Sequence, residues 1–168
     1  MDIILDFHPT PSVLELFRDE MKKEFEVNCR RGLFGNYDII QSRFNQNRAI
    51  VCIKDGKPIG FTTWQRWCKK EITIDLTWFL PSERSFFAAK RFINLVSKEF
   101  KRRRDLILKS KCITLNGLCL AHHYGFVIVE NQYSYDEIRE RFKYESGNVM
   151  FMEPVLTEKR FCEFETNN

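Results

Sequence analysis

Two carboxylates in one alternating segment are the first residues here that could do chemistry. The segment 71–80 reads EITIDLTWFL, with Glu71 and Asp75 on its polar side, because successive side chains of a strand point to opposite faces. A carboxylate next to a reacting group can remove a proton from it, directly or through a water. We therefore predict Asp75 as the first and Glu71 as the second candidate base. The alternative is that Asp75 is a solvated strand residue, or pairs with a neighbouring strand.

Two adjacent histidines and a tyrosine form a second group. His122 and His123 precede Tyr124, and histidine changes its charge close to neutral pH. His122 is a candidate acid or base, and Tyr124 could lie at the edge of an acceptor site. We favour a structural interpretation of the histidines, in which one packs at a helix end and the other is exposed. Tyr124 could likewise be a core residue with its hydroxyl in water.

The six cysteines do not predict a metal site. They contain no CxxC pair, and Cys119 with His122 lacks the second matched pair that zinc sites usually show. Several cysteines lie in apolar runs, where they behave as small buried hydrophobes. The start MDIILDFHP has no basic end followed by a long apolar stretch, and no segment approaches the roughly 20 apolar residues of a membrane span. We expect no metal, reduced thiols, no membrane and a cytoplasmic location.

A cluster of cations follows the segment around Pro81. The run KRFINLVSKEFKRRRD, 90–105, also has an apolar stripe at helical spacing, so that the cations would occupy the solvated side of a packed helix. The triple arginine would lie at the helix C-terminus, where positive charge is favourable. A nucleic-acid interface is the alternative; we favour the solvated helix.

The composition is that of a globular chain. There are 168 residues, 43% hydrophobic, with 16 phenylalanines and a net charge of +4. This is enough for one domain with a sizeable core. We predict a single domain over 1–168, with its core in 1–155 and a loose tail at 156–168.

The elements alternate between strands and helices. We expect an α/β (α+β) fold whose central sheet is mixed but mostly antiparallel and is flanked by helices. Thr10 is a candidate N-cap, Asp55-Gly56 marks a tight hairpin turn, and Ser82 or Ser85 could cap the helix after Pro81. The expected strands are 2–7, 48–54, 57–67, 71–80, 106–113, 127–133 and 148–156, and the expected helices 11–27, 38–47, 82–105, 114–125 and 136–144.

This order resembles the GNAT superfamily of acyl-CoA N-acyltransferases, over residues 1–130 and most clearly over 49–126. Three features carry the resemblance. They are the hairpin AIVCIKDGKPIGFTTW, the sequence Pro81-x-x-Arg84 between a strand and a long helix, and TLNGLCLAHHYGF, which is similar to the family's short helix ending in Gly-Phe.

The resemblance implies a cofactor site for acetyl-CoA. The family's phosphate loop aligns with Arg84, Ser85, Phe86, Phe87, Ala88 and Ala89; Arg84 and Ala89 fit the pattern, whereas Phe87 replaces the central glycine. A backbone N–H within Trp78, Phe79 and Leu80 would donate to the thioester carbonyl. Asn116 lies near the position of a frequent family asparagine. Ala121 stands where many members have a tyrosine acid, and Tyr133 or Tyr135 could replace it.

The implied activity is transfer of an acyl group from acyl-CoA to an amine by direct attack. The amine-bearing acceptor is of unknown size, and a homodimer is among the assemblies left open. The cofactor would lie in a splayed gap between the fourth and fifth strands. Two alternatives stay open: a GNAT-like binding or structural module that has lost catalysis, favoured by Phe87 and Ala121, and a basic nucleic-acid-binding domain.

Overall fold

The computed structural model describes most of the first hundred residues and parts of the remainder. The described residues are 2–28, 32–66, 71–84, 91–92, 94–96, 98–99, 107–111, 118–119, 122, 126–128, 134–144 and 155–158. They fall into two compact units, one of Met1–Gln65 with Leu76–Arg102 and one of Arg66–Asp75 with Arg103–Asn168. The expectation of a single domain stays a prediction, and each unit is described by itself.

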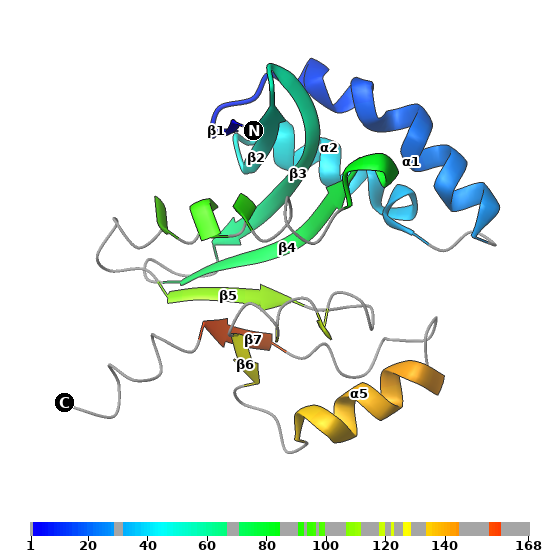
Figure 1. The fold of residues 1–168 in the computed structure, drawn as a ribbon, viewed down its shortest axis with the longest axis vertical. Helices are drawn as coiled ribbons and strands as arrows, with labels where there is room; N and C mark the ends of the chain where they lie inside the picture. Colours follow the sequence, from blue (N-terminus) through cyan, green and yellow to red (C-terminus); the bar gives the residue numbers. More distant parts are fainter. Residues whose placement is uncertain are drawn as a thin grey trace. The chain divides into compact units, whose positions relative to one another are not determined.

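An antiparallel meander forms the sheet of the first unit. Its strands are β1 (Ile3–Asp6), β2 (Ala49–Lys54), β3 (Lys57–Arg66) and the second half of β4 (Glu71–Phe79), in the order β1-β2-β3-β4 (Figure 1). β1 pairs with β2 and β2 with β3, both antiparallel. Beyond the end of β4 the Leu80 N–H donates to the carbonyl of Ile59 at 2.9 Å. The predicted meander is confirmed.

The turn between β2 and β3 has the geometry that its sequence predicts. Asp55 and Gly56 both have positive φ, 49° and 78°. Two consecutive residues in this region are characteristic of a type I′ turn, whose twist matches that of the strands it joins. Asp and Gly are the residues that adopt it at the lowest cost, so the local sequence sets the register of the hairpin.

Helices pack on one face of this sheet. Pro11–Leu14 forms a 3-10 turn (η1) leading into α1 (Glu15–Val27), and Leu33–Asn36 forms another (η2) before α2 (Tyr37–Asn45). Phe17 of α1 and Phe44 of α2 are fully buried against Phe61 of β3, with ring centroids 5.6 and 5.4 Å apart. The predicted helices are confirmed. Thr10 is the N-cap residue of η1, but its hydroxyl contacts the Ser12 hydroxyl and caps no backbone N–H.

The segment after β4 begins differently from our expectation. Pro81–Glu83 forms a short 3-10 turn (η3) whose N-cap residue is Leu80, so Ser82 lies within this turn and its predicted role as cap of the long helix is wrong. Ser85 lies outside the described residues. Further along, the described part of 91–99 is helical. Phe92 and Val96, four residues apart, are completely buried, and this part of the predicted stripe is confirmed.

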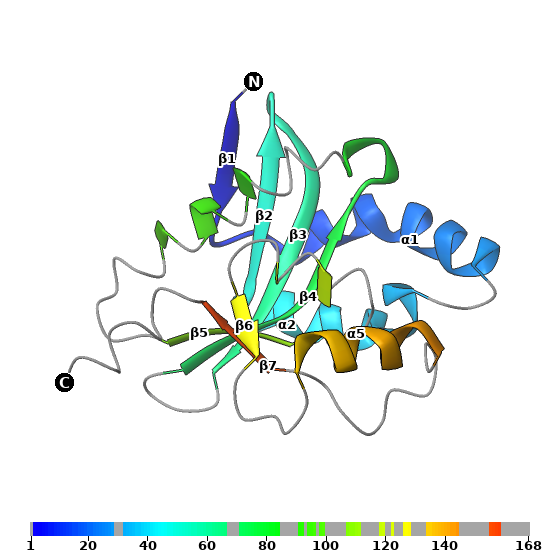
Figure 2. The same ribbon diagram turned by 60° about the horizontal axis from the view of Figure 1, so that its bottom comes forward.

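The second unit continues the sheet from the first half of β4. Glu71–Ile74 of β4 pair in parallel with β5 (Ile107–Lys111). β7 (Val155–Glu158) then pairs antiparallel with both β5 and β6 (Phe126–Ile128), giving the order β4-β5-β7-β6 (Figure 2). One parallel pair in an otherwise antiparallel sheet confirms the predicted fold class.

One boundary at the end of the chain was predicted wrongly. Residues 156–158 were assigned to a loose tail, but they are strand residues with hydrogen-bonded neighbours on both sides. A strand between two others satisfies both rows of its backbone groups, which favours order although Thr157 and Glu158 are not apolar. The predicted strand residues 148–154 lie outside the described residues.

The last described helix is α5 (Tyr135–Tyr144), and it begins with a capping box. The Glu137 carboxylate accepts from the backbone N–H of Ser134 at 2.7 Å, and the Glu137 N–H donates back to the Ser134 hydroxyl at 3.4 Å. This reciprocal pair satisfies two N–H groups at the helix start. Among the helices of the described part of the chain, none is long and apolar enough to cross a membrane.

Candidate functional site

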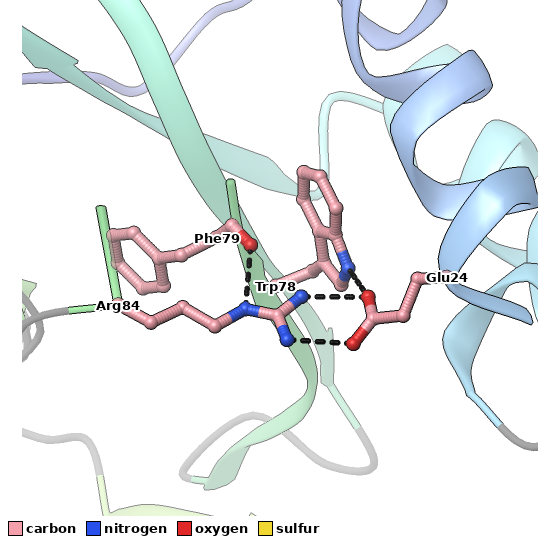
Figure 3. Close-up of polar contacts among 4 residues, drawn as sticks. All are labelled: Glu24, Trp78, Phe79 and Arg84. Atoms are coloured by element: carbon pink, nitrogen blue, oxygen red, sulfur yellow. Dashed lines mark hydrogen bonds and ion pairs between the residues drawn. The ribbon is translucent and has the colours of Figure 1, made fainter. Parts of the chain in front are cut away.

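The end of β4 carries a polar cluster centred on Arg84. Its two terminal guanidinium nitrogens donate to the two carboxylate oxygens of Glu24 on α1, each at 2.6 Å. Its Nε donates to the carbonyl of Phe79 at 2.9 Å. The indole N–H of Trp78 donates to the same Glu24 carboxylate at 2.8 Å, and the guanidinium lies 5.5 Å from the Trp78 ring (Figure 3). We call these four residues the Arg84 cluster.

The cluster keeps Glu24 ionised. Its pKa is lowered, first by the hydrogen bonds from Arg84 and then by that from Trp78 and the charge of Arg84, against an opposing effect of burial. Bidentate pairs between a guanidinium and a carboxylate are among the stronger hydrogen-bonded contacts in proteins. The side chain of Arg84 therefore has protein partners for all three of its guanidinium nitrogens.

A second ion pair holds the preceding residue. The Glu83 carboxylate in η3 accepts from Lys54 Nζ at the end of β2, at 2.6 Å. Both side chains are largely buried, at 21% and 23% exposure, so the pair is less screened by solvent than a surface pair would be. Glu83 and Arg84 thus attach the turn after β4 to two different elements, β2 and α1.

The backbone of β4 offers one of the three predicted donors to the edge away from β3. Leu80 donates its N–H to Ile59 of β3. In an antiparallel pair the N–H and C=O of one residue point to the same neighbour, and those of the next residue point to the opposite side. The Phe79 groups therefore face away from β3, as the contact of the Phe79 carbonyl with Arg84 also shows. By the same alternation the N–H of Trp78 faces β3.

The two predicted carboxylate bases lie in the part of β4 that belongs to the second unit. Asp75 is half-buried and has a polar interaction in the structure. The side chain of Glu71 lies outside the described residues. Thr73, on the same side of the strand, is 4% exposed, so that side of β4 is covered here. The roles of Asp75 and Glu71 as bases stay predictions.

His122 belongs to a cluster in the second unit. Its exposed ring stacks on that of Tyr135, with centroids 3.8 Å apart and planes 15° from parallel, and the Tyr135 hydroxyl donates to the Cys119 sulfur at 3.7 Å. Burial and the contact with Cys119 raise the pKa of Tyr135. The structure therefore supports the predicted packing role of a histidine at this helix, and neutral Tyr135 retains a proton near neutral pH.

Several predicted site residues lie outside the described part of the chain. They are Tyr124, Ser85, Phe86, Phe87, Ala88, Ala89 and Asn116. Among the residues that the structure describes, no three His, Cys, Asp or Glu side chains gather as metal ligands. Arg91 and Lys98 of the basic helix are exposed while its Phe92 and Val96 are buried, as the solvated-helix interpretation predicts.

Sequence reasoning missed Glu24, although a signal was present. Leu14, Phe17 and Met21 form the buried stripe of η1 and α1, and Glu24 continues it at the next helical position. A carboxylate in line with buried side chains requires a charged or hydrogen-bonding partner. The sequence does not reveal that this partner is Arg84, sixty residues further along.

Comparisons with known proteins identify the fold. A scan of protein-family models gives no match, and a search of curated proteins gives none either. Solved structures do match. An acetyltransferase of the GNAT family from Listeria monocytogenes 4b F2365 aligns with a TM-score of 0.60 at 10% identity, covering 79% of this chain and 90% of the other.

Two further structures agree with the first. The PaiA N-acetyltransferase from Thermoplasma acidophilum, solved in complex with coenzyme A, aligns with a TM-score of 0.60 at 12% identity, over 95% of this chain and 99% of that one. Aminoglycoside 6'-acetyltransferase type Ii aligns with a TM-score of 0.59 at 15% identity, over 77% and 84%. At these identities the likeness establishes the fold, and the predicted resemblance is confirmed at that level.

Proposed function

We propose that this chain, which has the fold of the GNAT acetyltransferases, transfers an acyl group from acyl-CoA to an amine. One observation carries the proposal. At the end of β4 the N–H of Phe79 points away from β3, and the turn that follows is held in place by Glu24 and Lys54. This arrangement can present a fixed backbone donor to the oxygen of a carbonyl group.

The reaction requires little from the protein. Acetyl-CoA supplies an acyl group activated as a thioester. The amine nitrogen would form a bond to the carbonyl carbon, the carbon–sulfur bond would break, and the thiol would leave with a proton. In this proposal the Phe79 N–H stabilises the charge that develops on the carbonyl oxygen. Asp75, or Glu71 in its place, takes the proton that the amine loses, directly or through a water.

Proton donors to the departing sulfur are also proposals. Ala121 cannot serve, because it has no titratable group. Tyr135 has a hydroxyl that keeps its proton at neutral pH, since its pKa is raised, and Tyr133, Tyr124 and His122 are the other candidates from the sequence. We favour Tyr135 among them, because its hydroxyl already donates a hydrogen bond to a sulfur atom, that of Cys119.

Anchoring of the cofactor is assigned to backbone groups. The Arg84 guanidinium is bound by Glu24 and Phe79, so we propose that the pyrophosphate is held by N–H groups of 85–89. Phe87 takes part through its backbone although it replaces a glycine. The acceptor amine is unassigned. A homodimer and a cytoplasmic location are kept as proposals without a structural argument.

The alternative is a module with this fold that binds but does not catalyse. Phe87 and Ala121, at positions where the family has a glycine and a tyrosine, favour it. The two functions separate at turnover, because only the enzyme releases free thiol from acetyl-CoA when an amine is present.

Calorimetric titration of the protein with acetyl-CoA tests the proposal, with desulfo-CoA as a control for thiol exchange at the cysteines. We expect a micromolar Kd, or about −8 kcal/mol, for both ligands, followed by thiol release with a panel of amines. Binding without turnover on any amine would support the non-catalytic module. No binding at millimolar cofactor would overturn the proposal.

A further inference from the structure

The turn after β4 is held more rigidly than a connecting turn requires. Two consecutive side chains, Glu83 and Arg84, bind charged partners on β2 and α1 at 2.6 Å. Arg84 uses three nitrogens at once, two on Glu24 and one on Phe79 (Figure 3). Because the guanidinium is planar, three simultaneous hydrogen bonds leave it a single orientation.

This orientation is transmitted to the backbone at Phe79. The Phe79 carbonyl accepts from Arg84 Nε at 2.9 Å, and the Leu80 N–H of the same peptide group donates to Ile59 at 2.9 Å. A planar peptide group bonded at both of its ends cannot rotate freely. The Phe79 N–H lies one peptide group earlier, and fixing the plane that follows it restricts the ψ angle of Phe79 and hence the aim of this N–H.

We infer that Glu24 and Arg84 are positioning residues for the acyl transfer proposed above. Glu24 orients the guanidinium, Arg84 holds the Phe79 carbonyl, and the Phe79 N–H is thereby kept aimed at the position of the reacting carbonyl oxygen. The inference rests on the proposed function. It assigns the charge of Arg84 to a partner within the protein and not to a phosphate of the cofactor.

Trp78 belongs to the same device. Its indole N–H holds the Glu24 oxygen that also accepts from Arg84, and its ring lies beside the guanidinium. The carboxylate of Glu24 therefore has little freedom to follow Arg84 away from β4. A small displacement of a group that contacts the reacting atoms can cost about a hundredfold in rate.

The neighbouring pair of Lys54 and Glu83 supplies the matched control. It has the same length, lies on the adjacent residue of the same turn and is at least as buried, but the contacts printed for it do not include the Phe79 peptide. Loss of either ion pair lowers stability. If the Arg84 cluster acts on catalysis, only its loss also lowers kcat.

The experiment compares wild type with Arg84→Lys, Glu24→Gln and Lys54→Met. Two quantities are measured below the melting temperature of each variant: hydrogen exchange at the Leu80 amide by NMR, and steady-state acetyl transfer from acetyl-CoA. We expect Arg84→Lys and Glu24→Gln to accelerate the exchange at least about tenfold and to lower kcat by about ten- to a hundredfold, with KM for acetyl-CoA within about twofold. Lys54→Met should lower Tm without either effect.

The outcomes separate this inference from the function on which it rests. If wild type transfers acetyl groups and both variants keep its kcat, the positioning role is overturned and the function stands. If Arg84→Lys raises KM for acetyl-CoA more than about tenfold with kcat unchanged, Arg84 binds the cofactor and the inference is overturned. If wild type has no activity, the function fails; faster exchange at Leu80 would then show that the cluster serves the fold alone.

Discussion

The backbone of Gly60 lies directly against the side chain of Phe79. A Cβ atom added at Gly60 would be 2.5 Å from Phe79 Cδ1 and 2.6 Å from the Trp78 carbonyl oxygen, distances that real atoms do not adopt. Glycine in a strand often marks such a close approach of two backbones. The residue before the proposed catalytic turn therefore packs against a position where no side chain fits.

We expect Gly60→Ala to destabilise the first unit. The added methyl group meets a backbone oxygen that cannot swing aside, and the Phe79 ring is itself held edge-on against Phe92, with centroids 5.2 Å apart. Overpacking of this kind costs about 1–3 kcal/mol, measured as the free energy of unfolding in urea. Gly35→Ala is the control, because its Cβ would lie 3.3 Å from the outer edge of the Phe25 ring, which can move. Equal losses for the two variants would contradict the argument.

The hairpin turn gives a second prediction. Gly56 has a φ of 78° and open space around its Cα, so Gly56→Ala introduces backbone strain without a clash. We expect a loss of about 1 kcal/mol in the free energy of unfolding. Asp55→Gly, at a φ of 49°, should cost less, because glycine relieves the strain at that position although it adds flexibility to the unfolded chain. A larger loss for Asp55→Gly would sink this interpretation.

Much of the fold is predictable because its signals are local. The Asp55-Gly56 turn sets the hairpin, alternation reveals β4, and Phe17 and Met21 at helical spacing reveal α1. The boundary at β7 was wrong because strand order there depends on pairing with β5 and β6, which are remote in sequence, while Thr157 and Glu158 carry no apolar signal.

The candidate site was predicted only in part, for the same physical reason. The resemblance identified Arg84 and the backbone at 78–80, but alternation of hydrogen bonds with β3 was needed to single out Phe79. The bond between Arg84 and Glu24 joins elements sixty residues apart, and no local pattern encodes which carboxylate a given arginine will meet.

The start of α5 offers a prediction in the second unit. Ser134→Ala removes the hydroxyl that caps the Glu137 N–H, and we expect a loss of about 1 kcal/mol in stability. Ser134→Asp retains a side-chain acceptor but places a second carboxylate beside that of Glu137, which contacts the Ser134 hydroxyl at 2.7 Å. Denaturant titration followed by circular dichroism measures both. Ser134→Thr, which keeps the hydroxyl, is the control and should recover most of the loss.

The ionisation of Glu24 predicts how the stability of the first unit depends on pH. Arg84 and Trp78 hold the pKa of Glu24 below its ordinary value of 4.5. A carboxylate whose pKa is lower in the folded chain contributes stability above its unfolded-state pKa and loses it as pH falls through the folded-state value. Between pH 7 and 5 we therefore expect a constant difference in the free energy of unfolding between wild type and Glu24→Gln, which should shrink below about pH 4.5. Urea titrations at half-unit steps of pH measure it.

Glu20→Gln serves as the control for this prediction. Glu20 is exposed one turn earlier on α1, so its removal should change stability little at any pH. The fluorescence of the three tryptophans gives an independent measurement, because protonation of Glu24 weakens its hydrogen bond with the Trp78 indole. Wild-type emission should change below pH 4.5 and that of Glu24→Gln should not. A difference in stability that persists undiminished to pH 3 would show that Glu24 acts through its shape or neutral hydrogen bonds, and not through its charge.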